Sequence, residues 1–453
     1  MKVAEVLDRA AWSPIHLRIA GALGVAWILD GFETTVTGPV LGNVAHELHF
    51  SGATAAWVNP IYTIGMLAGA LIFGPLADRL GRRKLFVLTL AIYASATVLT
   101  GFSWDFRSLA FFRLLTGIGI GGEYGAINSA IEEFIPSRYR GRVDGVINAS
   151  WNIGAVVASA AALTALGLLP TGAWRVVFWF GAVVAIAVVI VRNSLPESPR
   201  WLLARGRTVE AQAIVAKLFD PGGIAATSGS PSGESAASAG RSGYFHQVAQ
   251  LWRATPARLI FSFVLNLAQV MPYYGILAIG GLVIFPAVGI TGKGIPLLYL
   301  FGAVMGFCGQ LVMAWLSDAW GRRPTMLLAF GGAAALSGAL AVAHASGTFV
   351  FAFLLFSTFS AACGAGAYVV ISELFPTELR ATGIGFSVAV GRIGAIIAPI
   401  AFFAVNARLG VGSVFAGMAA IFGVGTLAMI WWYRYGVEGR GRSLEEMLQS
   451  GIR

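Results

Sequence analysis

Long apolar stretches, separated by short polar ones, run through almost the whole chain. A helix needs about 20 mainly apolar residues to cross the hydrocarbon core of a bilayer. By that rule the sequence predicts twelve membrane-spanning helices, at 17–41, 54–76, 85–103, 108–133, 143–168, 174–193, 256–286, 295–316, 325–346, 348–373, 381–407 and 411–434. Several segments exceed the minimum length, so we expect tilting or extension into the interfaces. The predicted fold class is an all-α polytopic membrane protein.

The composition excludes a water-soluble protein. Of the 453 residues, 57% are hydrophobic and only 11% are charged, whereas soluble domains carry about 25% charged residues. The net charge of +10 would suit a nucleic-acid partner. The basic residues, however, lie in short clusters between apolar stretches, where they orient helices, so we predict no nucleic-acid partner.

The short connections alternate in positive charge. One set holds ten basic residues and the other holds four. The first set is Arg79, Arg82, Arg83, Lys84, Arg138, Arg140, Arg142, Arg322, Arg323 and Arg380, and the second is Arg107, Arg175, Lys293 and Arg408. Because positively charged connections stay in the cytoplasm, we predict a multi-pass protein of the inner (plasma) membrane with both termini cytoplasmic. The N-terminal segment lacks a cleavage pattern, so we expect the first helix to be retained.

Two motifs recur at one spacing. The segment Asp78–Arg83 recurs as Asp318–Arg323, and Glu133 before Pro136 recurs as Glu373 before Pro376, each 240 residues later. Two unrelated motifs with the same offset indicate a duplicated six-helix unit. The predicted organisation is an N-terminal half (1–193), a cytoplasmic linker (194–255), a C-terminal half (256–435) and a cytoplasmic tail (436–453). We expect surface helices at 197–219 and a flexible Gly- and Ser-rich part at 220–243.

The repeated motifs place acidic residues beside arginines at the cytoplasmic helix ends. Such ion pairs can hold the cytoplasmic side closed in one state and separate in the other. The alternative is that the arginines only orient the helices. We assign the gate to Asp78, Arg82, Glu133, Arg140, Asp318, Arg322, Glu373 and Arg380.

Three segments resemble signatures of the major facilitator superfamily, within its sugar-porter and metabolite–proton symporter branch. Gly74–Lys84 is similar to the superfamily's loop between helices two and three. Pro196–Leu202 and Gly439–Glu446 resemble the central and C-terminal signatures of the branch. The resemblance covers essentially the whole chain. It implies two pseudo-symmetric six-helix halves with a central site between them, and transport by alternating access.

Charged groups at membrane depth cost at least ~2.5–3.5 kcal/mol each, so they mark function or a buried pair. Glu33 and Arg113 lie at similar depths in the first and fourth predicted helices. In proton-coupled sugar porters, the acid of a Gly-aromatic-Asp-Thr segment pairs with the Arg of Arg-x-x-x-Gly-x-Gly, and Gly31–Thr34 and Arg113–Gly119 resemble these segments. The resemblance implies that Glu33 takes and releases the coupling proton while Arg113 tunes its proton affinity. A static buried ion pair is the alternative.

Two further acidic residues lie near mid-depth. Asp30–Glu33 resembles the Asp-Gly-Phe-Asp motif of metabolite and aromatic-acid proton symporters. Asp30 is therefore a second proton site, a substrate contact or a hydrogen-bond partner of a neighbouring helix. Glu123 follows Gly122 in a segment similar to the Gly-Gly-Glu-Tyr of metabolite symporters, and it either lines the cavity or is a buried partner. The glycines before it predict close helix packing rather than a nucleotide-binding loop.

Arg392, in the eleventh predicted helix, is the main candidate for substrate recognition. A guanidinium in a polar cavity suits a carboxylate through bidentate hydrogen bonds. The internal repeat places Arg392 opposite Asn152. The alternative is a pair between Arg392 and an acid such as Glu123 or Asp30. We complete the predicted substrate site with Glu123, Asn152, Gln269, Tyr273 and Tyr62, and further candidates for its wall are Asn128, Asn148, Asn266, Tyr274, Gln310 and Tyr368.

Together these features predict a proton-coupled symporter of a small organic acid, aromatic or another monocarboxylate, with no cofactor beyond the proton gradient and no metal. Sugar porters usually carry a Gln-Gln pair in helix seven and a Trp in helix ten, whereas this chain has Asn266 with Gln269 and no Trp there. Sugar or polyol uptake, phosphate uptake, drug efflux and a non-transporting receptor remain open. Since no catalytic constellation is present, we predict that the protein is not an enzyme. We expect a monomer embedded in lipid.

Overall fold

The computed structural model describes the backbone of residues 12–80, 82–192, 202, 206–218, 249, 251–253, 255–343, 345–375 and 380–435. Within these ranges every regular element is a helix. This confirms the predicted fold class. The predicted tail lies outside the described residues, as does most of the linker. The linker does contain a helix, α11 (Thr208–Leu218), within the segment where a surface helix was predicted.

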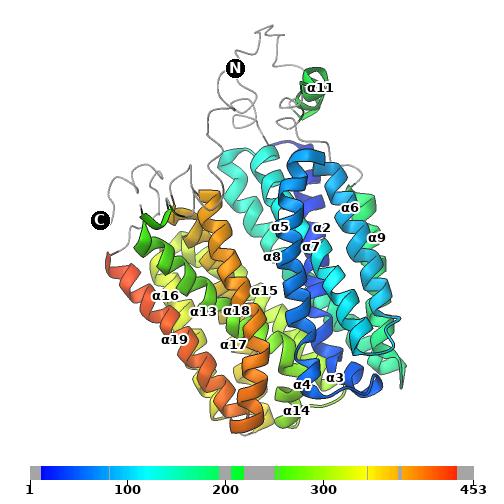
Figure 1. Ribbon diagram of the computed structural model, residues 1–453. Coiled ribbons are helices and arrows are strands. Elements are labelled where there is room, and N and C mark those ends of the chain that lie inside the picture. Colours follow the sequence, from blue (N-terminus) through cyan, green and yellow to red (C-terminus); the bar gives the residue numbers. More distant parts are fainter. Residues whose placement is uncertain are drawn as a thin grey trace.

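The N-terminal half contains six helical rods, each of which is a single long helix or a run of consecutive helices. The first is formed by α2 (Pro14–Thr35) and α3 (Thr37–Glu47). After the short α4 (Gly52–Ala55) come α5 (Val58–Leu80), α6 (Arg82–Thr100), α7 (Phe106–Phe134), α8 (Ser137–Leu168) and α9 (Ala173–Arg192). Blue to cyan-green ribbons in Figure 1 follow these rods side by side.

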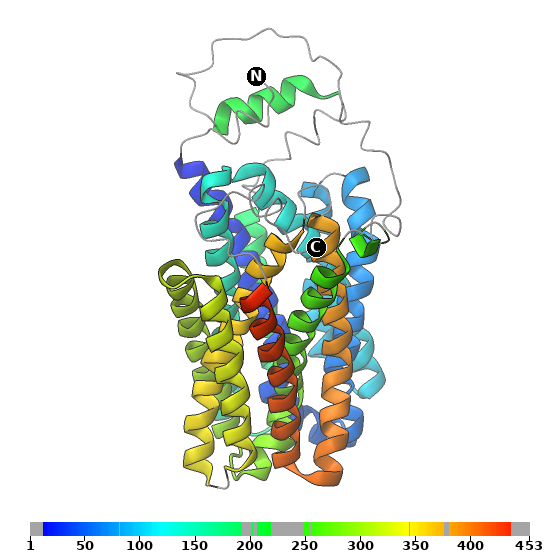
Figure 2. The same cartoon turned by 90° about the vertical axis from the view of Figure 1, so that its left-hand side faces the viewer.

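The C-terminal half repeats this arrangement. Its first rod is α13 (Pro256–Ile279), which continues through a π-helical turn, η1 (Gly280–Ile284), into α14 (Phe285–Ala287). The others are α15 (Gly294–Ala319), α16 (Arg322–Ala341), α17 (Ser346–Leu374), α18 (Arg380–Leu409) and α19 (Val411–Tyr435). Figure 2 shows α19 (red) with α16 (yellow-green) on one side and α13 (green), followed by α18 (orange), on the other.

These rods agree with the predicted number of twelve crossings. Among the described residues, nine helices are long and apolar enough to span a membrane, and two further apolar helices are shorter. Each helix lies at a position where the sequence predicts a crossing. The hydrophobic pattern therefore identified the transmembrane architecture.

The helix boundaries differ from the prediction at two informative places. The first rod is longer than predicted, since it runs through the helical residue Val36 to Glu47. One helical hydrogen bond is missing along it, because Pro39 has no N–H to donate to the carbonyl of Thr35. The ninth rod ends at Ala341, not at residue 346. It cannot continue further, since the next antiparallel helix begins at Ser346.

Glycines allow the helices of the N-terminal half to cross closely. A Cβ on Gly31 would collide with the backbone carbonyl of Trp151, and one on Gly154 would collide with the carbonyl of Ile28, so α2 and α8 nearly touch. Gly117, Gly119, Gly121 and Gly122 of α7 face α5 and α6 in the same way. This confirms that they are packing residues.

The two halves meet along several helices. In the N-terminal half, α8 packs against α15 and α5 packs against α18 of the other half. At the far end of the bundle, formed by α3, α4, η1 and α14, Gly38 lies against the carbonyl of Leu277 and its own carbonyl lies against Gly281. Figure 1 shows these elements together at the bottom. The halves are therefore in contact at the end opposite to the one where α2 begins.

Candidate functional site

The most deeply buried charges of the described bundle form one ion pair between α2 and α7. Arg113 is 0% exposed and Glu33 is 1% exposed. Nη1 of Arg113 lies 3.1 Å from Oε2 of Glu33, and Nη2 donates to the backbone carbonyl of Glu33 at 2.9 Å. The hydroxyl of Thr97, on α6, donates to Oε1 of Glu33 at 2.8 Å. Three helices thus converge on one carboxylate.

Aromatic rings complete the surroundings of this pair. The guanidinium of Arg113 lies 4.4 Å from the ring centre of Tyr62 and 5.6 Å from that of Phe178. Cation–π contacts of this kind offset part of the cost of taking a cation out of water. The Tyr62 hydroxyl also lies 3.2 Å from that of Thr34. The structure thus places Tyr62, a predicted substrate residue, beside the ion pair.

Asp30 connects the first rod to α8. Its side chain is 4% exposed, and Oδ2 accepts a hydrogen bond of 2.8 Å from the indole of Trp151. The ring of Trp151 lies 5.8 Å from that of Tyr273, on α13 of the other half. Of the three roles considered for Asp30, this geometry displays the hydrogen bond to a neighbouring helix. It also links the acid to the interface between the halves.

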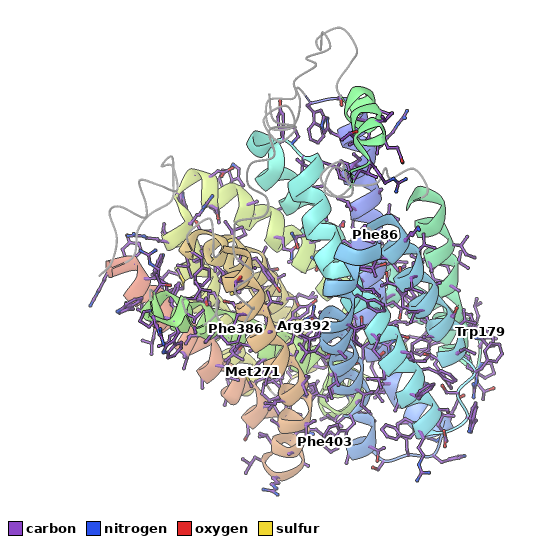
Figure 3. All side chains as sticks on the ribbon, turned by 45° about the horizontal axis from the view of Figure 1, so that its top comes forward. Phe86, Trp179, Met271, Phe386, Arg392 and Phe403 are labelled. Carbon is purple, nitrogen blue, oxygen red and sulfur yellow. The ribbon has the colours of Figure 1, made fainter. Side chains whose placement is uncertain are left out.

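Two polar contacts cross that interface directly. Asn152 donates to Oε1 of Gln310 at 2.9 Å, which joins α8 to α15. Arg392, on α18, places Nη1 3.0 Å from the sulfur of Met66 on α5. In Figure 3, Arg392 lies where α18 faces the N-terminal half. A thioether is a weak acceptor, so this contact is one that a stronger acceptor can displace.

The hydroxyls of Tyr274 and Tyr368 lie within electrostatic range of Arg392. Gln269 donates to Oδ1 of Asn266 at 3.2 Å within α13. Glu123 is 3% exposed on α7. The predicted substrate residues therefore occupy several places rather than one cluster.

A cavity lies between the halves. Thr35, from α2, and Asn152, from α8, line it on one side. Residues of α13, α15 and α17 line it on the other, among them Tyr273 and Ser360. Two of the predicted substrate residues, Asn152 and Tyr273, thus face this cavity. Such a cavity can hold a small molecule in contact with both halves.

Of the predicted gate, only Asp318 and Arg322 have described side chains. Asp318 is exposed at the end of α15, and Arg322 is half-buried at the start of α16. Gly321 between them has a φ of 95°, which is the tight glycine turn that the motif predicts. The side chains of Asp78, Arg82, Glu133, Arg140, Glu373 and Arg380 lie outside the described residues.

Sequence reasoning did not single out Thr97, Trp151 or Met66. Thr97 gave a weak signal, because it is one polar residue in an apolar helix. Trp151 had an indirect signal, because it precedes Asn152, which the internal repeat placed at the level of Arg392. Met66 gave none, since a methionine in a transmembrane helix usually only packs.

Two halves of six membrane-crossing helices, with a buried acid–base pair and a cavity between the halves, define a membrane transporter of the major facilitator class. The chain belongs to the "Sugar (and other) transporter" family, whose model matches residues 30–449. It is accordingly a multi-pass membrane transporter of small molecules and not an enzyme.

Named relatives are similar along most of the chain. The niacin transporter NiaP of Acinetobacter baylyi is 28% identical over 409 residues, covering 88% of this chain and 89% of that protein. The benzoate transport protein of the same organism is 25% identical over 420 residues, covering 88% and 85%. The inward-open structure of the xylose transporter XylE of Escherichia coli superposes with a TM-score of 0.75 at 17% identity, covering 96% of this chain and 100% of that one. That structure shows the shared fold.

Proposed function

We propose that the protein is a proton-coupled symporter that carries a small organic acid, aromatic or another monocarboxylate, across the cytoplasmic membrane by alternating access. Both termini lie in the cytoplasm in this proposal, and the protein works as a monomer. The observation that carries it is the buried Glu33–Arg113 pair with its third partner, Thr97.

The chemistry of that pair suits a proton carrier. The guanidinium and the hydroxyl both favour the charged form of the carboxylate, whereas its burial disfavours the charge. When Glu33 takes up a proton, it loses its charge and its attraction to Arg113. The local arrangement of α2 against α6 and α7 therefore has two states that differ by one proton.

A route from this pair to the other half runs along α2. Glu33 and Asp30 lie three residues apart and share one helix face. Asp30 bonds to Trp151, whose ring packs against Tyr273 of the C-terminal half. A shift of α2 on protonation thus moves a contact between the halves, and this is what coupling of proton and substrate requires.

An organic acid fits the polar groups of the C-terminal half. Arg392 faces the interface with a thioether at Nη1, and the two hydroxyls of Tyr274 and Tyr368 lie within its range. A carboxylate is a far stronger acceptor than a thioether. The named relatives support this choice, because niacin and benzoate are both aromatic carboxylic acids.

A sugar or polyol is the second candidate. The observation that favours it is the pair of amide contacts Asn152–Gln310 and Asn266–Gln269, since neutral amides suit hydroxyl groups.

The test is uptake into proteoliposomes under an imposed pH gradient, with benzoate, nicotinate, acetate, xylose and phosphate as substrates. We expect gradient-driven accumulation of an acid, which Glu33→Gln abolishes while acid–acid exchange continues. Glu210→Gln is the matched control, because Glu210 is an exposed partner of Arg207 on α11. Xylose uptake without acid uptake would replace the proposal by the second candidate. Equal accumulation by Glu33→Gln would place the proton site elsewhere.

A further inference from the structure

The residues that line the cavity between the halves indicate what kind of ligand it accepts. Aromatic side chains of α15 and α17, among them Tyr299, Phe353 and Phe356, form one part of its lining. Gly302 and Gly306 on α15 form another part and add no side chain. An aromatic lining of this kind suits a ligand that carries an aromatic ring. Ring–ring contacts then add a geometric preference beyond simple burial.

Two hydroxyls in the same lining are buried without a hydrogen-bond partner in the described part of the chain. They belong to Thr35 and Ser360, each 2% exposed. Buried hydroxyls are nearly always bonded, so an unbonded one at a cavity indicates a partner that arrives with a ligand. Thr35 lies on α2 of one half and Ser360 on α17 of the other. A ligand bonded to both therefore links the halves.

Neighbouring residues of α13 link the cavity to the group that we assign to the carboxylate. Tyr273 lines the cavity, and the next residue, Tyr274, interacts electrostatically with Arg392 of α18.

We propose that this cavity holds the aromatic ring of the carried acid and that the hydroxyls of Thr35 and Ser360 hydrogen-bond to a polar ring substituent. The preferred substrate is then an aromatic monocarboxylate with a phenolic hydroxyl or a ring nitrogen. This inference rests on the proposed function, since it specifies the substrate class of the same transporter. An aliphatic acid leaves both hydroxyls unbonded and makes no ring contact.

The test measures binding to the purified full-length protein by calorimetry, with 3-hydroxybenzoate, nicotinate, benzoate and cyclohexanecarboxylate as probes. We expect 3-hydroxybenzoate or nicotinate to bind roughly 3- to 10-fold more tightly than benzoate, the range expected for one net hydrogen bond. Cyclohexanecarboxylate should bind more weakly than benzoate, because it lacks a flat ring.

Ser360→Ala should remove the advantage of the substituted ring, so that the ratio of 3-hydroxybenzoate to benzoate affinity falls towards one. Thr35→Val removes the other hydroxyl, on the N-terminal half, and should have the same effect. With two variants, misfolding of one does not prevent the test. Ser337→Ala is the matched control, because Ser337 is a fully buried serine of α16 that bonds to the carbonyl of Ala333. Thermal unfolding of each variant reports whether it is folded.

Different failures are distinguishable. If acids are taken up with the proton gradient but neither substituent nor ring alters affinity, this inference is overturned and the proposed function stands. The same holds if Ser360→Ala and Thr35→Val weaken all four probes equally. If no acid binds or is taken up by the wild-type protein, both proposals are overturned.

Discussion

At the scale of single residues, the Glu33–Arg113 pair carries most of the account. Both side chains are almost fully buried, so each is the other's main compensation for leaving water. Its partners could be predicted in part. Equal depth along two helices indicated that Glu33 and Arg113 can meet. Depth does not predict which side chains of a neighbouring helix face the pair. Thr97 was missed for this reason, as was Trp151, the partner of Asp30.

Removing Arg113 alone should destabilise the protein more than neutralising both residues of the pair. Arg113→Ala leaves the Glu33 carboxylate buried beside only Thr97, and we expect a loss of about 3–5 kcal/mol in stability. The double variant Glu33→Gln, Arg113→Gln should recover most of that stability, because no uncompensated charge remains, yet it should not couple uptake to protons. Thermal unfolding in detergent and gradient-driven uptake measure the two effects. Equal stability of the single and double variants would contradict the pairing.

Acid should weaken the start of α7 through Asp105. Its carboxylate accepts a 2.8 Å hydrogen bond from the backbone N–H of Ser108, and this bond holds the pKa of Asp105 below its ordinary value. Because the folded pKa is lowered, the stabilisation is present above the ordinary carboxyl pKa of about 4 and is lost as the pH falls through the folded value. Asp105→Asn should flatten this part of the pH–Tm curve. An unchanged slope would show that the cap contributes nothing.

At the scale of elements, close helix crossings fix the geometry of the site. Gly31 and Gly154 let α2 approach α8, and this approach brings Asp30 to Trp151. The hydrophobic pattern predicts that these helices exist and where they lie along the chain. It does not predict the π turn of η1, because that turn depends on local backbone bonding rather than on apolar length.

Gly154→Ala should separate α2 from α8. The added Cβ meets the carbonyl oxygen of Ile28, a backbone atom that cannot rotate away. We expect a loss of about 1–3 kcal/mol, as for overpacked cores, together with impaired transport. Gly145→Ala on the same helix is the control, since nothing lies within 4 Å of its Cβ, and alanine there should gain about 0.5–1 kcal/mol through helix propensity. Similar Tm values for the two variants would refute the tight crossing.

At the scale of the whole molecule, the duplicated halves meet at the far end through backbone contacts. Gly38 on α3 touches the carbonyl of Leu277, and a Cβ there would lie 3.1 Å from the Tyr299 ring. The internal repeat predicted two halves, but it carries no information about which end is in contact. Which end is in contact differs between the conformations of a transporter, and one sequence encodes all of these conformations.

Gly38→Trp should hold the far end open. The indole has no room against Leu277 and Tyr299 in the observed arrangement. We expect substrate binding to persist and transport to fall to background. A cysteine placed at Gly42, in a background lacking Cys308 and Cys363, should then be alkylated faster than without the tryptophan. Gly417→Trp is the control, because its Cβ has open space around it. Unchanged alkylation would show that Gly38 does not control closure.

The central claim is that Glu33 carries the proton that drives the substrate. The most direct measurement is the pH change outside proteoliposomes when an acid taken up in the first assay is added without any imposed gradient. We predict proton movement into the vesicles with the acid for the wild-type protein, and none for Glu33→Gln, although labelled acid still exchanges across that variant. Proton movement of the same size in Glu33→Gln would contradict the account.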